Sequence, residues 1–335
     1  MKKLSYLFKR IFDMDYKQML KTSKTIHERT GKNTLFILFD IIICGFKYQA
    51  GYMDYLVFEF YNLKSYQRKT YITRGINNSY VRTFNNRAYW AIFSDKIQTL
   101  KVFKKVIGRK WLYLLESDYP HFEEFVKTTD KFVVKPIDGT CGRGVDFYES
   151  KDINDIKALY KKLGENNQYL VEEFVNQHSK MSKLYSGSVN TLRIVTILKD
   201  GIVHFPFCSI RIGNGKNVDN LNSGGMASII DYKTGIITKP AADKDGKIYI
   251  NHPISKTKIV GFKIPMFYES IELIKVAAKI VPEVAYVGWD IAITENGPVL
   301  IEANQFPGHD IYQFHAHLED NKIGLKPVFD KILNS

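Results

Sequence analysis

Apolar residues recur with two different periods along this chain, and each period predicts one kind of element. Helical spacing occurs in 93–108, 152–163 and 267–281. Apolar or alternating runs, rich in β-branched residues and bounded by turn residues, predict strands over 131–136, 168–175, 190–198, 202–212 and 227–231. This mixture predicts an α+β fold with mostly antiparallel sheets flanked by helices.

Residue types at the ends of the helical segments predict where each helix begins or stops. Ser94 or Asp95 can cap the first helix, and Asp152 or Asn154 the second, because short polar side chains accept bonds from free N–H groups. Pro282 is expected to end the third helix, since proline cannot continue it.

Two apolar segments lie near the N-terminus. Residues 35–46, LFILFDIIICGF, are too few to span a bilayer and include Asp40, so we expect a buried element rather than a membrane anchor. Residues 1–12 have the pattern of a basic amphipathic helix, which either lies on an anionic membrane surface or docks on the protein's own core. The aromatic-rich segment 52–73 has no period that assigns it.

Positive charge is concentrated in the first third of the chain. Residues 1–110 hold 22 Lys and Arg against 7 Asp and Glu, a net +15, whereas residues 111–335 hold 26 against 28, a net −2. Such a field favours a nucleic acid, a membrane face or a polyanionic substrate, unless it is only a solvated basic surface. No helix-turn-helix, zinc-finger or RNA-binding signature is present, so we expect no nucleic-acid partner.

The cysteines indicate a compartment. Cys44, Cys141 and Cys208 are odd in number and widely spaced, which fits neither a disulfide framework nor a metal site. We therefore expect a cytoplasmic location, with peripheral contact to the inner membrane surface left open by the basic N-terminal segment.

The stretch GWDIAITENGPVLIEANQFPG (288–308) predicts a hairpin that carries oxygen ligands. A three-residue loop ending at Gly297 pairs Asp290 with Glu302 and places Asn304 on the same face. Facing carboxylates repel unless a cation lies between them, and two carboxylates with an amide oxygen are hard ligands that suit Mg²⁺. A surface hairpin whose acids happen to face each other is the alternative.

The stretch KFVVKPIDGTCGRGV (131–145) predicts a strand that ends at Lys135 and leads into a glycine-rich loop. Glycines allow backbone N–H groups to converge on an anion, and the lysine adds a positive charge at the strand end. The order of residues matches neither G-x-x-x-x-G-K-[ST] nor G-x-G-x-x-G, so a P-loop and a Rossmann loop are excluded. We expect a phosphate-binding loop of another type.

Taken in order, these motifs resemble the ATP-grasp superfamily, and most closely its sugar-transfer-associated branch. The matching stretches are SDK (94–96), Lys135 with its glycine loop, VEEFV (171–175), Gln177–His178, Ser188–Arg193, DNLNSGG (219–225) and Gly288–Asn304. The resemblance spans roughly residues 35–315 and is specific from residue 94. It implies two α+β lobes that grip ATP, with residues 1–93 as a basic lobe on the acceptor side, 94–185 as the N-terminal subdomain, and 186–335 as the C-terminal subdomain with the metal site.

The resemblance also implies roles for individual residues. Those expected at the phosphates are Lys96, Lys135, Gly139, Gly142, Arg143 and Gly144, with Arg193 and Asn220 near the γ-phosphate and the transferred group. Those expected at the nucleoside are Glu172, Val175, and Glu173 or His178, the last two being alternatives for the ribose. The implied magnesium ligands are Asp290, Glu302 and Asn304, and the implied substrate contacts are Ser188, Asn190, Arg211, Gly224 and Gly225.

The implied activity is carboxylate activation with ATP and Mg²⁺. The γ-phosphate passes to a carboxylate, and an amine then displaces phosphate from the acyl phosphate, with Arg193 and Lys135 as the catalytic cations. The branch and the basic first third point to a sugar acid or an anionic surface polysaccharide as the acceptor, with an amine donor. An ATP-dependent sugar kinase and a basic, membrane-associated protein without activity are the alternatives.

Overall fold

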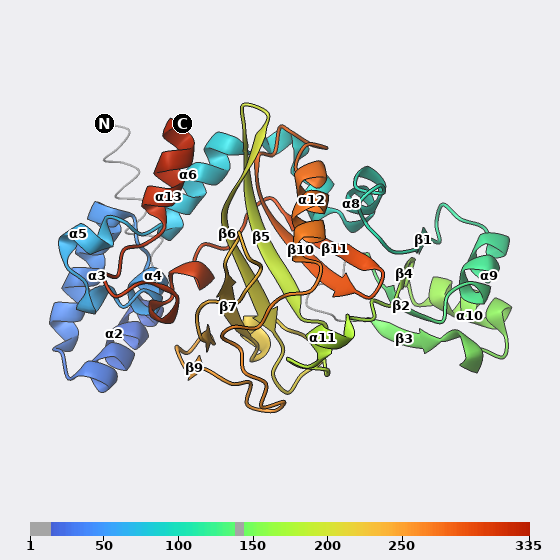
Figure 1. Cartoon of the computed structure of the whole chain (residues 1–335), viewed down its shortest axis with the longest axis horizontal. Coiled ribbons are helices and arrows are strands. Elements are labelled where there is room, and N and C mark those ends of the chain that lie inside the picture. The colour runs from blue at the N-terminus through green and yellow to red at the C-terminus, as the bar shows by residue number, and fades with distance from the viewer. Residues whose placement is uncertain (1–14, 138–143) are drawn as a thin grey trace.

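The computed structural model describes residues 15–137 and 144–335, and in these residues the strands form two antiparallel sheets. The small sheet has the order β1-β4-β2-β3 and the large sheet the order β11-β10-β5-β6-β7-β8-β9. The large sheet lies between the N-terminal helices at one end of the molecule and the small sheet at the other (Figure 1). The predicted α+β class is confirmed.

Each predicted run at 131–136, 168–175, 190–198, 202–212 and 227–231 contains or overlaps a strand, but four short strands, β1, β3, β8 and β9, were not predicted. The small sheet comprises β1 (Trp111–Tyr113), β2 (Lys131–Lys135), β3 (Asp146–Glu149) and β4 (Leu170–Glu173). The large sheet comprises β5 (Thr191–Lys199), β6 (Ile202–Ile212), β7 (Met226–Ile230), β8 (Ala241–Ala242), β9 (Ile248–Tyr249), β10 (Tyr286–Thr294) and β11 (Gly297–Asn304).

The helices surround these sheets. The N-terminal ones are α2 (Tyr16–Thr30), α3 (Thr34–Tyr48), α4 (Tyr52–Val57), α5 (Ser65–Arg68) and α6 (Arg74–Phe84). The later ones are α7 (Ala91–Ser94), α8 (Lys96–Val102), α9 (Tyr119–Lys127), α10 (Ile156–Glu165), α11 (Ser179–Ser182), α12 (Phe267–Ala277) and α13 (Lys326–Asn334).

The predicted helix ends were partly right. Asp95 caps α8 by accepting bonds from the N–H groups of Ile97 and Gln98 at 2.8 and 3.1 Å, and its extended backbone separates α7 from α8. The caps predicted for the second helix were wrong, because the helix begins later and Asp155 accepts from the Ala158 N–H at 2.9 Å. The stop predicted at Pro282 was also wrong, since α12 ends at Ala277, where the chain tightens into turns.

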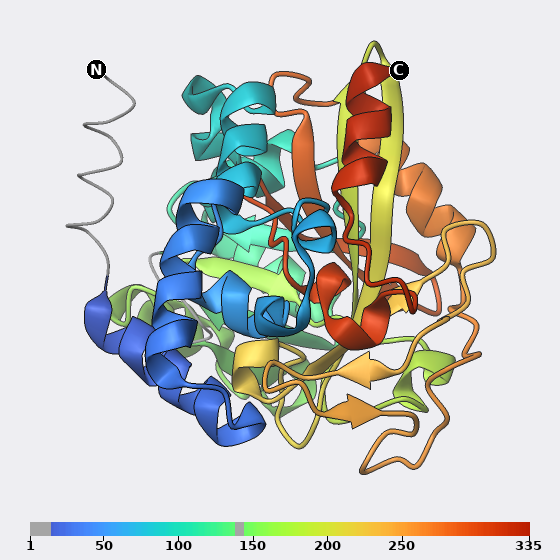
Figure 2. The same cartoon turned by 90° about the vertical axis from the view of Figure 1, so that its left-hand side faces the viewer.

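Each sheet has its own apolar core. α9 and α10 cover the small sheet, with Phe122 and Leu163 packed among strand residues such as Phe132. α8 and α12 cover one face of the large sheet around Trp289. α6 and α13 cover the other face, and α13 lies along β6 (Figure 2). Phe329 of α13 packs in this core.

A third core joins α2, α3 and α4 into a helical N-terminal lobe. The prediction that 35–46 is a buried element was wrong for half of its surface. α3 buries Ile37, Ile41 and Cys44, but its opposite side is exposed, because the lobe packs against only one side of the helix. In the described part of the chain, no helix is both long and apolar enough to cross a membrane. The amphipathic segment predicted at 1–12 lies outside the described residues.

The β10–β11 hairpin has the predicted pair but not the predicted loop. Asp290 lies opposite Glu302, yet Thr294 pairs with Gly297, so the loop has two residues and not three. A β-bulge opposite Asp290 and Ile291 inserts one extra residue into β11. The shorter loop and the bulge shift the register by one residue in opposite directions, and the carboxylates face each other again.

Candidate active site

A row of functional side chains crosses three neighbouring strands of the large sheet. Arg193 on β5 lies opposite Asp290 on β10, and Asp290 lies opposite Glu302 on β11. Arg193 donates from Nη2 to Asp290 Oδ2 at 2.9 Å and from Nε to Oδ1. Since residues opposite each other share a face of the sheet, the antiparallel register alone assembles this row.

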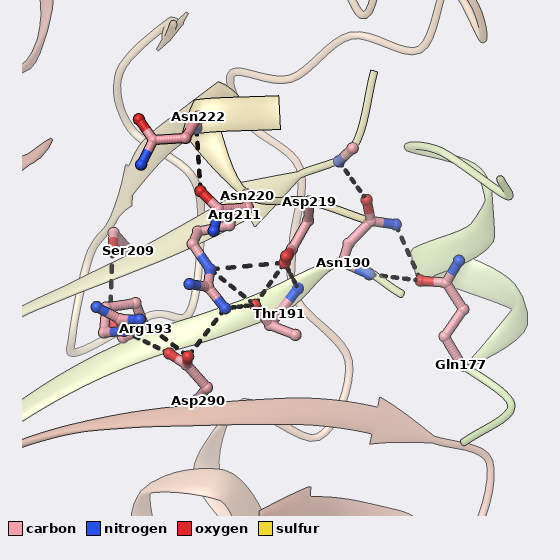
Figure 3. A network of polar contacts seen from close by, with 11 residues as sticks. Gln177, Asn190, Thr191, Arg193, Ser209, Arg211, Asp219, Asn220, Asn222 and Asp290 are labelled. Carbon is pink, nitrogen blue, oxygen red and sulfur yellow. Dashed lines mark hydrogen bonds and ion pairs between the residues drawn. The ribbon is translucent and has the colours of Figure 1, made fainter. Parts of the chain in front are cut away.

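A second arginine shares the same carboxylate. Arg211 on β6 donates from Nη2 to Asp290 Oδ2 at 2.9 Å and lies 3.6 Å from Asp219 (Figure 3). Asp219 in turn accepts from the Thr191 N–H at 2.9 Å and from its hydroxyl group. Asp290 and Asp219 thus hold both guanidinium groups in fixed positions.

The two carboxylates of the hairpin are in different environments. Burial acts to raise the pKa of Asp290, but Arg193 and Arg211 outweigh it and the pKa is lowered. Desolvation by the surrounding protein raises the pKa of Glu302, and the negative charge of Asp290 raises it further, although Glu302 keeps an exposed surface. Asp290 is therefore already neutralised by its neighbours, whereas Glu302 lacks a full counter-charge.

The donor set fits Mg²⁺. Asp290, Glu302 and Asn304, which lies opposite Gly288, offer two carboxylates and an amide oxygen from one face of the hairpin. A carboxylate has about four lone-pair sites, and the two arginines use three of those on Asp290. Among the described residues, no three or more His, Cys, Asp or Glu side chains come together as a metal site. In general, Mg²⁺ bound by few protein ligands keeps several waters and also takes phosphate oxygens.

A second charged cluster lies at the end of the small sheet. Lys135 at the end of β2 and Arg109, which precedes β1, both form ion pairs with Glu172 of β4. Glu172 is 3% exposed, and burial acts to raise its pKa, but Arg109 and Lys135 outweigh this and lower the pKa to about 2. Arg109 also donates to the backbone carbonyl of Leu300 on β11. One guanidinium therefore joins the small sheet to the β10–β11 hairpin.

Lys96 and the glycine loop lie close together. The Lys96 ammonium group is 3.2 Å from the carbonyl oxygen of Ile137, at the start of this loop. Gly144 ends the loop with a φ of +71°, and a Cβ there would lie 3.1 Å from Pro136. Gly139, Gly142 and Arg143 were also predicted here, but they lie outside the described residues.

The residues predicted at the nucleoside lie at the end of β4 and in the segment that follows it. Glu173 accepts from the Lys110 N–H at 2.9 Å, and Val175 lies two residues beyond it, partly buried. His178 donates its backbone N–H to the carbonyl of Ile293 at 2.7 Å, and its ring is 3.3 Å from Glu295. These bonds attach the segment after β4 to the β10–β11 turn.

Two of the predicted substrate residues, Asn190 and Ser188, are buried within the protein. Asn190 is fully buried, and its side-chain amide bonds to Gln177, Met181, Tyr185 and Gly213. Its amide bonds only to other groups of the protein, so Asn190 holds neighbouring segments in place and offers no group to a substrate. Ser188 is also buried, and its hydroxyl has no hydrogen-bond partner within the described residues.

The loop 219–225 has a tight backbone. Gly224 has a φ of +95°, and a Cβ on Gly225 would lie 2.3 Å from the Asp219 carbonyl oxygen. Asn220 accepts from the Asn222 N–H at 3.0 Å and lines a cleft. The two glycines thus act through the backbone that holds Asp219 and Asn220.

A cleft of about 990 Å³ adjoins the two arginines. Its lining includes Arg193, Arg211 and Asn220 from the large sheet and its loop. Its opposite wall is formed by Arg29 at the end of α2 and by Met53, Leu56 and Val57 of α4. The N-terminal lobe therefore forms one side of this cleft.

Sequence reasoning missed Arg109 and the role of Asp219. Arg109 carries no motif, and its partners Glu172 and Leu300 are 63 and 191 positions away. Asp219 lies within the DNLNSGG stretch, so the sequence placed it near the site. Its ion pair with Arg211 could not be predicted from that stretch.

One family model matches most of the chain. A family model described as sugar-transfer associated ATP-grasp matches residues 75–328. The solved ATP-grasp ligase PsnB, complexed with a minimal precursor, has a TM-score of 0.45 at 13% identity, covering 77% of this chain and 68% of that one. D-alanine–D-alanine ligase from Bacillus anthracis has a TM-score of 0.40 at 14% identity, covering 77% and 74%. Among curated protein sequences, none matches the chain.

Proposed function

Because the chain belongs to the sugar-transfer associated ATP-grasp family, whose enzymes are ATP-dependent ligases that use Mg²⁺, we propose that it joins the carboxylate of a sugar acid to an amine. The acceptor is a sugar acid or an anionic cell-surface polysaccharide, and the reaction passes through an acyl phosphate. The proposal therefore takes the chain to be an enzyme, and not a basic membrane-associated protein without activity.

The observation that carries this proposal is the row Arg193–Asp290–Glu302, which adjoins the cleft at Arg193 and Arg211. In the proposal, Asp290, Glu302 and Asn304 hold Mg²⁺, which when bound neutralises phosphate charge. Lys135 and Lys96 contact the phosphates from the side of the small sheet. Arg193 stabilises charge on the phosphoryl group during transfer, because its guanidinium is held in place before the substrate arrives.

The size of the cleft supports an extended acceptor. A volume of about 990 Å³ is at the upper end of the range of ligand sites, which is roughly 300–1,000 Å³. Its lining combines cations such as Arg29 and Lys322 with acids such as Glu59 and Asp310. In the proposal, Arg211 and Asn220 bind the acceptor carboxylate, and the acidic part of the lining receives the amine as an ammonium ion.

Phosphorus NMR tests the reaction. The purified protein is incubated with Mg-ATP, uronic acid oligomers and a pool of amino acids. ADP with free phosphate, formed only when both substrates are present, is the expected result, and mass spectrometry then identifies the amide. ADP with a new phosphoester signal would replace the ligase with a sugar kinase, and no turnover with these oligomers would refute the acceptor class.

A further inference from the structure

α3 exposes an apolar face that no described part of the chain covers. Its exposed side chains are Leu35 (75%), Phe36 (65%), Phe39 (64%), Ile43 (39%) and Phe46 (46%), here called the outer face of α3. Positions 36, 39, 43 and 46 lie on one side of a helix, opposite the buried residues Ile37, Ile41 and Cys44. A continuous apolar surface of this kind marks an interaction site.

The acidic residue of this helix does not interrupt the outer face. Asp40 accepts two bonds from the Arg68 guanidinium at 2.7 and 2.9 Å and one from the Tyr55 hydroxyl at 2.7 Å. Both partners belong to the N-terminal lobe, so the charge of Asp40 is neutralised on the side that faces the protein.

Cations lie on the neighbouring helix. α2 packs beside α3 (Figures 1 and 2) and exposes Lys17, Lys21 and Lys24, which form no ion pair with any described residue. An apolar helical face beside exposed lysines is the chemistry that binds an anionic lipid surface.

We propose that the outer face of α3 docks the protein onto an anionic lipid bilayer. α3 has 15 residues and at 1.5 Å per residue is only about 22 Å long, so it lies in the interface and does not cross it. Charge favours this occupant over a second copy of the chain, because two copies facing each other would bring like-charged lysines together.

Docking would also position the cleft. α2 and α4 supply Arg29 and Met53 to its wall, so the lobe that meets the bilayer is the lobe that borders the cleft. The lipid contact rests on the surface of α2 and α3 and does not depend on the reaction chemistry.

Vesicle co-sedimentation of the full chain tests this inference. Vesicles are made of phosphatidylcholine alone or of phosphatidylcholine with phosphatidylglycerol. We expect binding to the anionic vesicles only, decreasing with salt. The double variant Phe36→Ser/Phe39→Ser should bind about 100-fold more weakly, since two aromatic side chains no longer enter the interface. The triple variant Lys17→Gln/Lys21→Gln/Lys24→Gln should lose about tenfold or more.

A matched control replaces two apolar residues that are exposed elsewhere, Leu115→Ser/Val276→Ser, with 59% and 57% exposure. It should bind as the parent does. Failure of the parent to bind anionic vesicles, or unchanged binding by both α3 and lysine variants, would overturn the inference. A dimer in sedimentation equilibrium that Phe36→Ser/Phe39→Ser dissociates, without lipid binding, would assign the face to a second copy instead.

Discussion

The side chains of Asp290 and Glu302 face each other, but the two carboxylates differ in burial and in ion pairing. Asp290 is 1% exposed and is the shared counter-ion of two partly buried guanidinium groups. Glu302 keeps contact with solvent and has a raised pKa, so its charge is the one that a cation would relieve. A substitution of Asp290 should therefore affect both the stability of the fold and the site. A substitution of Glu302 should affect the site and leave the fold intact.

We expect Glu302→Gln to reduce turnover of Mg-ATP by roughly 100-fold or more, since a charged ligand becomes a neutral amide. The free energy of unfolding should change by less than about 0.5 kcal/mol, because the residue is partly exposed and its repulsion from Asp290 is removed. ATP consumption and urea unfolding measure the two quantities. Glu269→Gln on α12 is the matched control, and normal ATP consumption by Glu302→Gln would refute the metal assignment.

Glu172 provides a test of pH dependence. Its pKa is lowered from 4.5 to about 2 in the folded protein, so the carboxylate contributes stability above pH 4.5 and loses it as the pH falls toward 2. Glu172→Gln should be less stable by about 3 kcal/mol at neutral pH, because Arg109 and Lys135 lose their buried counter-ion. Urea unfolding of both proteins should show this difference narrowing below pH 4.5. A difference that stays constant with pH would show that folding does not lower the pKa of Glu172.

At the scale of elements, the loop 219–225 connects backbone geometry to the site. Gly225 donates its N–H to the Asn220 carbonyl at 3.1 Å and passes so close to Asp219 that there is no room for a side chain. Asp219 holds Arg211, which borders the cleft. Any change that moves this loop should therefore alter substrate binding before it alters the sheet.

Gly225→Ala should displace the loop, since its Cβ would lie 2.3 Å from the Asp219 carbonyl oxygen. We expect the KM for the acceptor to rise by about tenfold, while the Kd for Mg-ATP, measured by calorimetry, stays within about twofold. The control is Gly164→Ala on α10, where an added Cβ meets no neighbour within 4 Å. Equal effects of the two variants would show that the close approach at Gly225 has no consequence for the site.

At the scale of the whole molecule, the cleft depends on how the N-terminal lobe is attached. Gln313 is fully buried and bonds to both the N–H and the carbonyl of Ile72, each at 2.9 Å. It also bonds to the His309 carbonyl at 2.7 Å and accepts from the Leu325 N–H at 3.1 Å. One side chain thus ties the lobe to the segments that follow β11.

Gln313→Leu should lower the free energy of unfolding by about 3 kcal/mol, because several buried backbone groups lose their partner. We also expect limited proteolysis to cut within residues 15–70 faster than in the parent, since the lobe is held less firmly. Gln98→Leu, at an exposed position of α8, is the control. If the stability and the cleavage pattern of Gln313→Leu match the parent, Gln313 does not anchor the lobe.

The sequence by itself determined the longer strands, the α+β class and the facing pair Asp290–Glu302, but not the short strands β1, β3, β8 and β9. Side-chain alternation and hairpin pairing are local, because a strand and its neighbour 12 positions away obey the same period. Even the wrong loop length left this pair intact, since the bulge restored the register that the shorter loop had shifted. The family motifs in residues 94–304 are also short local stretches, so they could be located from the sequence.

Only the tertiary structure decided which charges meet and which apolar face stays exposed. Arg109 reaches Glu172 and Leu300, and Arg211 reaches both Asp219 and Asp290, through packing between strands that are far apart in the sequence. α3 is apolar on two opposite sides, and its sequence does not say which side the lobe covers. Long-range packing selects one partner surface among several of similar hydrophobicity, and that selection is a property of the whole chain.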